Sequence, residues 1–274
     1  MQQKQPHTNR VSIRRRAKIV AKQRVMRCLL PVMEAVLICV LPIILIAGPI
    51  QTYIYSTGQL LFPIVLFVAA VILLIMPLVY GLMGFLMRVL TGERPPLLCV
   101  FDGLAGVENY LRSVKLGLCI FVHIVLWMII PIAATAGYCY FMLLRDPAIL
   151  ENAEKLYQLI LQMSGLYLVV MIPFLARILR YFIAYPMIMR DRSLGAWQAT
   201  RQAARAFKGH NLHLIVLVVS FFGWQLVGMW TMGIGTLFYW GYLLSALLMY
   251  FWYLEHPDGG ENQQSESIPE QKQE

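Results

Sequence analysis

The chain has 274 residues, of which 59% are hydrophobic and only 14% are charged. Soluble domains carry about 25% charged residues, so a water-soluble globule of this size could not hide so many apolar side chains. The composition therefore predicts an integral membrane protein. The formal net charge of +9 would suggest a nucleic acid partner in a soluble protein. Here the basic residues cluster beside apolar runs, so membrane orientation explains them better and no nucleic acid partner is predicted.

The first 27 residues form a basic segment that contains nine Lys and Arg residues and no acidic residue. Its apolar residues recur at helical spacing, which is typical of a cationic helix that lies on an anionic lipid surface. The alternative is a disordered basic tail that only sets the topology. In the first interpretation the membrane-surface residues are Arg14, Arg15, Arg16, Lys18, Lys22, Arg24 and Arg27.

Six apolar runs follow, each long enough to cross most of a hydrocarbon core of about 30 Å. The expected spans are residues 28–50, 59–87, 116–143, 165–189, 212–230 and 237–254. The fold class predicted is an all-α, polytopic membrane protein whose six transmembrane helices form three hairpins. A basic amphipathic cytoplasmic segment precedes each hairpin.

Several local features refine this plan. We expect kinks at Pro42 and Pro77, an amphipathic helix over residues 100–115, and a short separate helix near residues 151–162. The six-helix membrane domain covers residues 28–254, and the polar tail from residue 255 to 274 is expected to be disordered.

Lys and Arg are distributed unevenly over the loops between the runs. Nineteen lie on one side, whereas only Arg145 and Lys155 lie on the other. The positive-inside rule then predicts a multi-pass protein of the cell membrane with both termini in the cytoplasm.

Four stretches between residues 180 and 235 carry a family resemblance. They are Arg180-Tyr181-Phe182-Ile183-Ala184-Tyr185, Ala206-Phe207-Lys208-Gly209-His210, Ser220-Phe221-Phe222-Gly223-Trp224 and Thr231-Met232-Gly233-Ile234-Gly235. Through them the chain resembles the uncharacterised bacterial membrane proteins of domain-of-unknown-function family 975. The resemblance implies a six-helix membrane protein without assigned chemistry. The chain is more distantly similar to the membrane domain attached to some glycerophosphodiester phosphodiesterases.

Two arginines interrupt the fourth apolar run near its middle, at Arg177 and Arg180. An arginine at the bilayer centre costs about 2.5 to 3.5 kcal/mol on insertion scales, so it normally faces a bundle interior or a wet cavity. One interpretation is a cytoplasm-facing pocket for a phosphate or carboxylate, with Glu34 and His123 as further ligand-binding residues. The alternatives are a structural ion pair between Glu34 and Arg180, or a helix that ends early and leaves both arginines at the interface.

Motifs for chemistry are missing from the sequence. It contains no Gly-x-Ser-x-Gly, no His-Glu-x-x-His and no phosphate-binding loop, so no catalytic residue is predicted and the protein is not expected to be an enzyme. The five cysteines include no Cys-x-x-Cys pair, and His210 and His213 have no nearby acid or cysteine. No disulfide, metal site or cofactor is therefore expected.

These observations favour a non-enzymatic protein of the bacterial cell envelope, a scaffold or accessory to a transport or lipid-related system. Its expected partners are a bilayer with anionic lipid at the cytoplasmic face and a membrane protein whose identity the sequence does not give. The alternative is a permease or exporter that binds an anionic or lipid-like solute through the intramembrane arginines. A lipid-active enzyme follows only from the distant phosphodiesterase resemblance.

Overall fold

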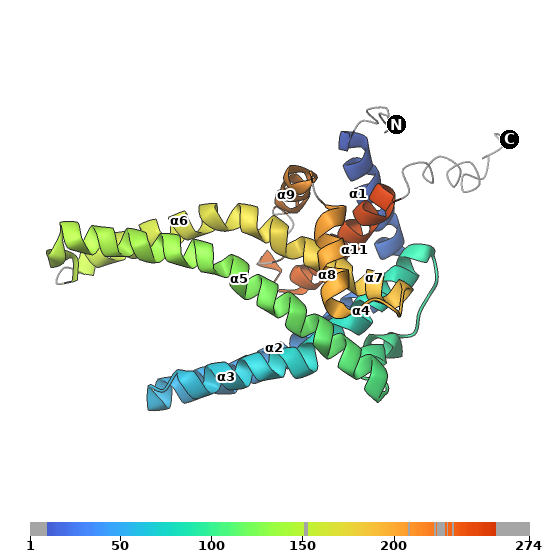
Figure 1. Ribbon diagram of the computed structural model, residues 1–274, viewed down its shortest axis with the longest axis horizontal. Helices are drawn as coiled ribbons and strands as arrows, with labels where there is room; N and C mark the ends of the chain where they lie inside the picture. The colour runs from blue at the N-terminus through green and yellow to red at the C-terminus, as the bar shows by residue number, and fades with distance from the viewer. Residues whose placement is uncertain are drawn as a thin grey trace. The chain divides into compact units, whose positions relative to one another are not determined.

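The computed structural model describes residues 10–150, 153–207, 209–221, 223, 228, 230–231 and 233–255. Throughout these residues the chain forms helices joined by turns, with no strand (Figure 1). It divides into two compact units: unit 1 comprises Met1–Ser113 with Ser220–Glu274, and unit 2 comprises Val114–Val219. The all-α prediction is therefore confirmed for the part of the chain described.

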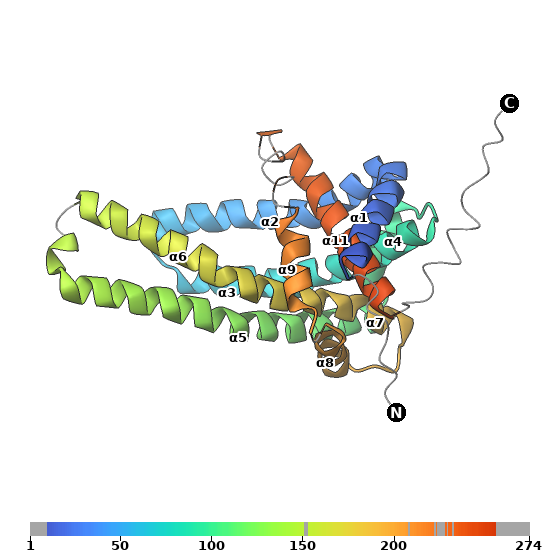
Figure 2. The same cartoon turned by 90° about the horizontal axis from the view of Figure 1, so that it is seen from above.

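Unit 1 is organised around the last helix of the chain, α11. This helix contacts α1, α2 and α4, and Figure 2 shows α1 and α11 side by side. The elements of unit 1 are α1 (Arg10–Arg27), α2 (Leu29–Thr57), α3 (Leu61–Ala70), the π-helical segment η1 (Val71–Ile75), α4 (Met76–Thr91), the 3-10 helix η2 (Leu97–Gly103), the first residues of α5 (Val107–Arg145), and α11 (Ile234–Glu255).

The basic N-terminal segment forms a helix from Arg10 onward, so the alternative of a disordered tail is wrong for residues 10–27. Ala17, Ala21 and Val25 are fully buried. They stand four residues apart, which puts them on one helix face, and their small size lets α1 approach α11 closely. The least polar face of α1 is thus used for packing against protein.

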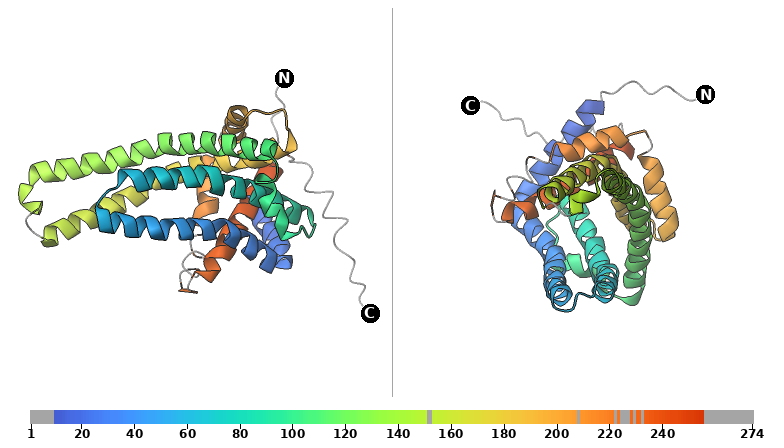
Figure 3. Two further views of the ribbon diagram at one scale, coloured as in Figure 1. Left: turned by 90° about the horizontal axis from the view of Figure 1, so that it is seen from below. Right: turned by 90° about the vertical axis from the view of Figure 1, so that its left-hand side faces the viewer.

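The second apolar run is one helical element from Leu61 to Thr91, slightly longer at its end than the expected span. A π-helical turn, η1, directly precedes α4, which begins at Met76 and has Pro77 as its second residue. A proline cannot donate an i to i−4 hydrogen bond and its ring crowds the preceding turn, so a wider turn there relieves the conflict. The kinks expected at Pro42 and Pro77 stay predictions. In Figure 3 the α2 helix and the α3–α4 run lie antiparallel and side by side.

The contact between α4 and η2 depends on two glycines. A Cβ atom at Gly81 would collide with the carbonyl oxygen of Val100, and a Cβ atom at Gly103 would collide with the carbonyl oxygen of Pro77. Each segment therefore places a glycine against the backbone of the other, and no larger residue would fit.

Unit 2 is built on the hairpin of α5 and α6, which lie side by side in Figures 1 and 2. Near its tip, the Tyr138 hydroxyl donates to Gln162 Oε1 (3.0 Å) and Lys155 Nζ lies 2.7 Å from Asp146 Oδ2. The elements after the hairpin turn are the 3-10 helix η3 (Pro147–Leu150), α6 (Ala153–Leu179), the 3-10 helix η4 (Arg180–Ile183), α7 (Ala184–Arg190), α8 (Ala196–Ala206) and α9 (Asn211–Val219).

The predictions of two short helices are wrong. No separate helix ends near residue 162, because α6 runs without a break from Ala153 to Leu179. Residues 100–115 do not form one amphipathic helix either: η2 ends at Gly103, Gly106 adopts a φ of +79°, and α5 then continues to Arg145. By contrast, α8 is a separate amphipathic helix that buries Ala199 and Ala203.

Five helices within the described residues are long and apolar enough to cross a membrane. They are Leu29–Thr57, Leu61–Thr91, Val107–Arg145, Ala153–Arg190 and Gly235–Glu255. The predicted span 212–230 is helical as α9 up to Val219, and several of its later residues lie outside the described residues. The tail from residue 256 and residues 1–9 also lie outside them. The described part of the chain is thus helical and suited to a membrane, while the sixth span remains a prediction.

Candidate functional site

Unit 2 holds both arginines of the fourth apolar run beside a group of aromatic side chains. The guanidinium carbon of Arg177 lies 4.3 Å from the centre of the Trp127 ring. The Trp127 Nε1–H donates a hydrogen bond to the Tyr181 hydroxyl (3.2 Å), so the indole is held in place beneath the arginine. A guanidinium over an indole face is attracted by the ring quadrupole, which contributes about 0.5 to 2 kcal/mol. This contact holds the charge of Arg177 on α6 against α5.

His123 lies within the same aromatic group. Its ring centre is 4.6 Å from that of Tyr181 and 4.9 Å from that of Trp197. Its Nδ1 is 2.7 Å from the carbonyl oxygen of Cys119. Since a carbonyl oxygen can only accept, Nδ1 is the donor in this contact. His123 therefore joins α5, η4 and α8 as a packed aromatic ring.

Arg180 stands where the α-helix α6 changes to the 3-10 helix η4. Its guanidinium carbon is 5.5 Å from the Tyr181 ring centre, and its Nε is buried with no hydrogen-bond partner among the described residues. Arginine stays protonated, so this N–H is a strong donor that has lost its water. Leaving such a donor unpaired costs about 1 to 3 kcal/mol or more.

Tyr181 connects the members of this arginine–aromatic cluster, which we define as His123, Trp127, Arg177, Arg180, Tyr181 and Trp197. It touches His123, accepts a hydrogen bond from Trp127 and has its ring centre 5.5 Å from the guanidinium carbon of Arg180. Its side chain is only 4% exposed. Three of the four predicted ligand-binding residues thus belong to one cluster in one unit.

Glu34, the fourth predicted residue, lies in unit 1, exposed on α2. The ion pairs within the described residues are Arg88–Asp102, Arg112–Glu108 and Lys155–Asp146, and none includes Glu34. Its pairing with Arg180 stays a prediction. The α-helix α6 ends at Leu179 and Arg180 begins the 3-10 helix η4, while helical structure continues to Arg190. The alternative of two arginines at the membrane interface stays a prediction.

Sequence reasoning missed the three large aromatic members of the cluster. A signal for two of them is present: His123 and Trp127 are four residues apart on α5, and Arg177 and Tyr181 are four residues apart on the run of α6 and η4. That spacing puts each pair on one helix face. Trp197 lies on the separate helix α8, and no spacing links it to the other members.

The membrane-surface residues of α1 fall into two groups. Arg15, Arg16, Lys22 and Arg27 are exposed, whereas Arg14, Lys18 and Arg24 are partly buried. Lys18 Nζ lies 4.7 Å from the centre of the Phe221 ring. Burial, and secondarily the charge of Arg14, lower the pKa of Lys18 below its ordinary value. Part of the basic set thus contacts protein, which the expectation of a purely lipid-facing helix did not include.

The remaining candidates for metal or thiol chemistry stand apart from one another. All five cysteines are free thiols. No group of three or more His, Cys, Asp or Glu side chains that could hold a metal ion occurs in the described ranges. The rings of His210 and His213 have their centres 6.2 Å apart.

Comparison with known proteins gives one match. The family model described as "Protein of unknown function (DUF975)" matches residues 8–256. No curated protein and no solved structure matches the chain. The distant similarity to the membrane domain of glycerophosphodiester phosphodiesterases has no support in these comparisons.

Proposed function

This chain belongs to the DUF975 family of unknown function, and from its own residues we propose that it is a non-enzymatic membrane protein that binds an anionic, lipid-like molecule. The proposed binding site is the arginine–aromatic cluster of unit 2. The role that fits such a protein is an accessory or scaffold of a transport or lipid-related system in the bacterial cell envelope.

The observation that carries this proposal is the pair of guanidinium groups at Arg177 and Arg180. Neither takes part in an ion pair or a hydrogen bond through its side chain within the described residues, so two positive charges in an apolar helical run lack a counter-charge. Charges in such runs are normally paired or mark a ligand site. A bound anion would supply the missing counter-charge.

The surroundings favour a ligand with an apolar part. Leu126 and Ile130 on α5 are 55% and 49% exposed, and Leu175 on α6 is 38% exposed. They lie within a few residues of Trp127 and Arg177 along the same two helices. An acyl chain could cover these side chains while its headgroup meets the arginines.

Binding can be tested on the full-length protein in a neutral detergent by thermal unfolding. Dioctanoyl phosphatidylglycerol should raise the unfolding midpoint of the parent protein, and dioctanoyl phosphatidylcholine should not. Arg180→Gln should lose the shift. The matched control is Arg201→Gln, which removes an exposed arginine on α8 of the same unit and should keep the shift. An equal shift in parent and Arg180→Gln would refute the site.

A permease is the second candidate, because both arginines lie well inside the run Ala153–Arg190, which is suited to cross a membrane. In proteoliposomes, a permease for lipid-like anions would move fluorescently labelled phosphatidylglycerol between leaflets, measured by dithionite quenching. Movement in the parent and none in Arg180→Gln would favour the permease. Binding without movement would favour the accessory role.

The orientation we propose places both termini in the cytoplasm, on the basis of the loop charges. Single cysteines at Gln59 and Glu154, in a variant without native cysteines, should react with an impermeant maleimide added outside cells. A cysteine at Gly195 should react only after the membrane is opened. The reverse pattern would overturn the orientation.

A further inference from the structure

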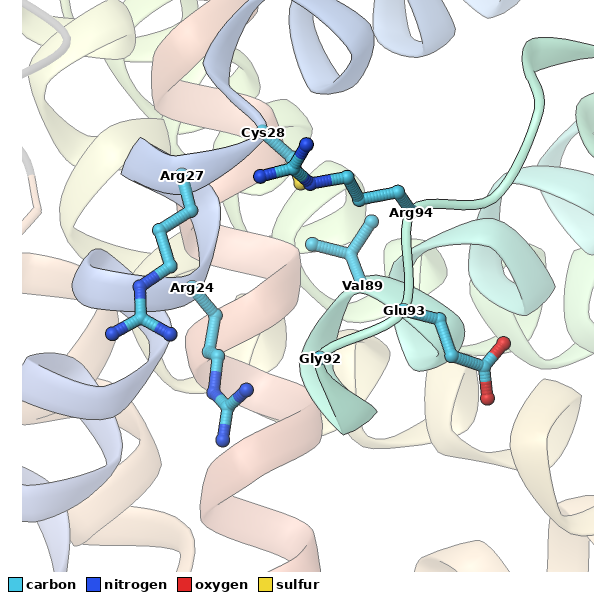
Figure 4. Close-up of a pocket in the computed structure, with 7 residues that line it drawn as sticks. All are labelled: Arg24, Arg27, Cys28, Val89, Gly92, Glu93 and Arg94. Carbon is cyan, nitrogen blue, oxygen red and sulfur yellow. The ribbon is translucent and has the colours of Figure 1, made fainter. Parts of the chain in front are cut away.

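A second basic site lies in unit 1, away from the residues used so far. It is a pocket of about 110 Å³ formed by the end of α1, the start of α2 and the end of α4 with the loop after it. Figure 4 shows the seven lining residues: Arg24, Arg27, Cys28, Val89, Gly92, Glu93 and Arg94. At about 30 Å³ for each water molecule, the volume equals that of three to four waters, which suits one phosphoryl group with its oxygens.

The three arginines of this pocket have their hydrogen-bonding groups available. No described residue accepts a hydrogen bond from the side chain of Arg24, Arg27 or Arg94, or forms an ion pair with it. The one acidic residue of the lining, Glu93, accepts from the Thr91 hydroxyl (3.3 Å). In Figure 4 its carboxylate points away from the three guanidinium groups. The three guanidinium groups at the pocket therefore offer hydrogen-bond donors that no described residue accepts from.

The charge balance of the lining favours an anion. The three arginines contribute three positive charges, and the Glu93 carboxylate together with the C-terminal ends of α1 and α4, at about half a negative charge each, offsets about two of them. A phosphomonoester is anionic near neutral pH and has three acceptor oxygens, so it matches the sign of the charge and the donors.

The glycine at position 92 leaves space for the guanidinium group of Arg24. The glycine ends α4 with a φ of +95°, a conformation that side chains disfavour. A Cβ atom at this position would collide with Nη1 of Arg24. The absence of a side chain at Gly92 thus lets the guanidinium of Arg24 reach the wall of the pocket.

The location of the pocket along the chain places it at the height of lipid headgroups. Cys28 directly precedes α2, and Gly92 directly follows the run that ends at Thr91. These two antiparallel helical runs are both suited to cross a membrane, so Leu29 and Thr91 lie at the same end of the hairpin. Exposed Met26 and Leu30 flank the site on α1 and α2 and would reach toward the acyl region.

We propose that Arg24, Arg27 and Arg94 bind one phosphomonoester group, as found in the headgroup of phosphatidic acid or in free phosphate. This is a defined site on unit 1, in contrast to diffuse attraction of α1 by a charged surface. It is also independent of the cluster in unit 2.

The test uses the full-length protein in neutral detergent at constant ionic strength. Dioctanoyl phosphatidic acid and inorganic phosphate are titrated separately, and affinity is taken from the thermal unfolding midpoint. The double variant Arg24→Gln with Arg94→Gln should bind about tenfold more weakly or worse, because each lost hydrogen bond to a charged group is worth at least that factor. The matched control, Arg15→Gln with Arg16→Gln, removes the same charge from exposed positions of α1 and should bind like the parent.

The source of the phosphoryl group follows from the two titrations. Tighter binding of phosphatidic acid than of phosphate supports a lipid ligand, and equal binding supports a free phosphate ligand. Equal weakening in pocket and control variants, or no response of the parent to either compound, would overturn the proposal. Since Arg94 lies exposed in a loop, Arg94→Gln alone tests the site if the double variant does not fold. Arg180→Gln should leave this binding unchanged, which separates the two sites.

Discussion

The hydroxyl of Tyr110 donates a hydrogen bond to the carbonyl oxygen of Leu73, 3.1 Å away. Leu73 stands four residues before Pro77, so its carbonyl is the acceptor that an α-helix would pair with residue 77, where proline has no N–H. The start of α5 thus reaches the helix turn that proline disturbs. The Tyr110 side chain, from a distant segment, thus satisfies a carbonyl group within the π-helical turn η1.

Tyr110→Phe should lower the free energy of unfolding by about 1 kcal/mol, since it removes this hydrogen bond and leaves the ring in place. Unfolding in mixed micelles with increasing denaturing detergent measures the change. Tyr140→Phe is the control, because Tyr140 is 66% exposed and should show no loss. Equal stability of the parent and Tyr110→Phe would show that the Leu73 carbonyl is satisfied without it.

Gly81→Ala should destabilise the protein by about 1 to 3 kcal/mol, because the new methyl group meets the backbone of Val100, which cannot rotate away. Gly137→Ala is the matched control: it is also helical, and nothing lies within 4 Å of its added Cβ. The control should be neutral or more stable, since alanine favours a helix. A loss of stability in Gly137→Ala as large as in Gly81→Ala would contradict the close contact of α4 with η2.

Arg180→Leu should leave the unfolding midpoint in detergent equal to that of the parent or higher, because it removes a buried donor without a partner. Adding Glu34→Leu should change stability additively, within about 0.5 kcal/mol, because Glu34 is exposed on α2. A double-mutant cycle measures the coupling. If Arg180→Leu destabilised the protein and Glu34→Leu restored it, the two side chains would form a structural ion pair and the proposed anion site would be lost.

The lowered pKa of Lys18 predicts how stability depends on pH. Its pKa in the folded protein lies below the ordinary value of 10.5, so at pH values between the two the unfolded chain binds more protons. The free energy of unfolding should therefore rise with pH through that window, since the folded state is relieved of a charge that its surroundings disfavour. Lys18→Arg stays charged throughout and should lack the rise. Identical pH profiles for the two proteins would contradict the effect of burial.

Much of the fold followed from the sequence, because hydropathy and length are local properties. The apolar runs at 28–50, 59–87 and 237–254 reappear as helices close to their expected limits. The points at which the long helices begin were predicted less well. Helix α5 begins at Val107 and helix α6 at Ala153, both about ten residues before the expected spans. The residues that precede each apolar run are more polar, and whether they continue the helix depends on packing.

The candidate sites show the same difference between local sequence features and tertiary contacts. The sequence by itself marked Arg177, Arg180 and His123, since a charge or imidazole in an apolar run is anomalous wherever it packs. Only the tertiary structure showed that Trp127, Tyr181 and Trp197 surround them, and only it brought Arg24 beside Gly92 and Arg94. The cost of inserting a charged residue into lipid depends on that residue and on the hydropathy of the run around it. A pocket requires residues about 70 positions apart to meet, and no local pattern records that contact.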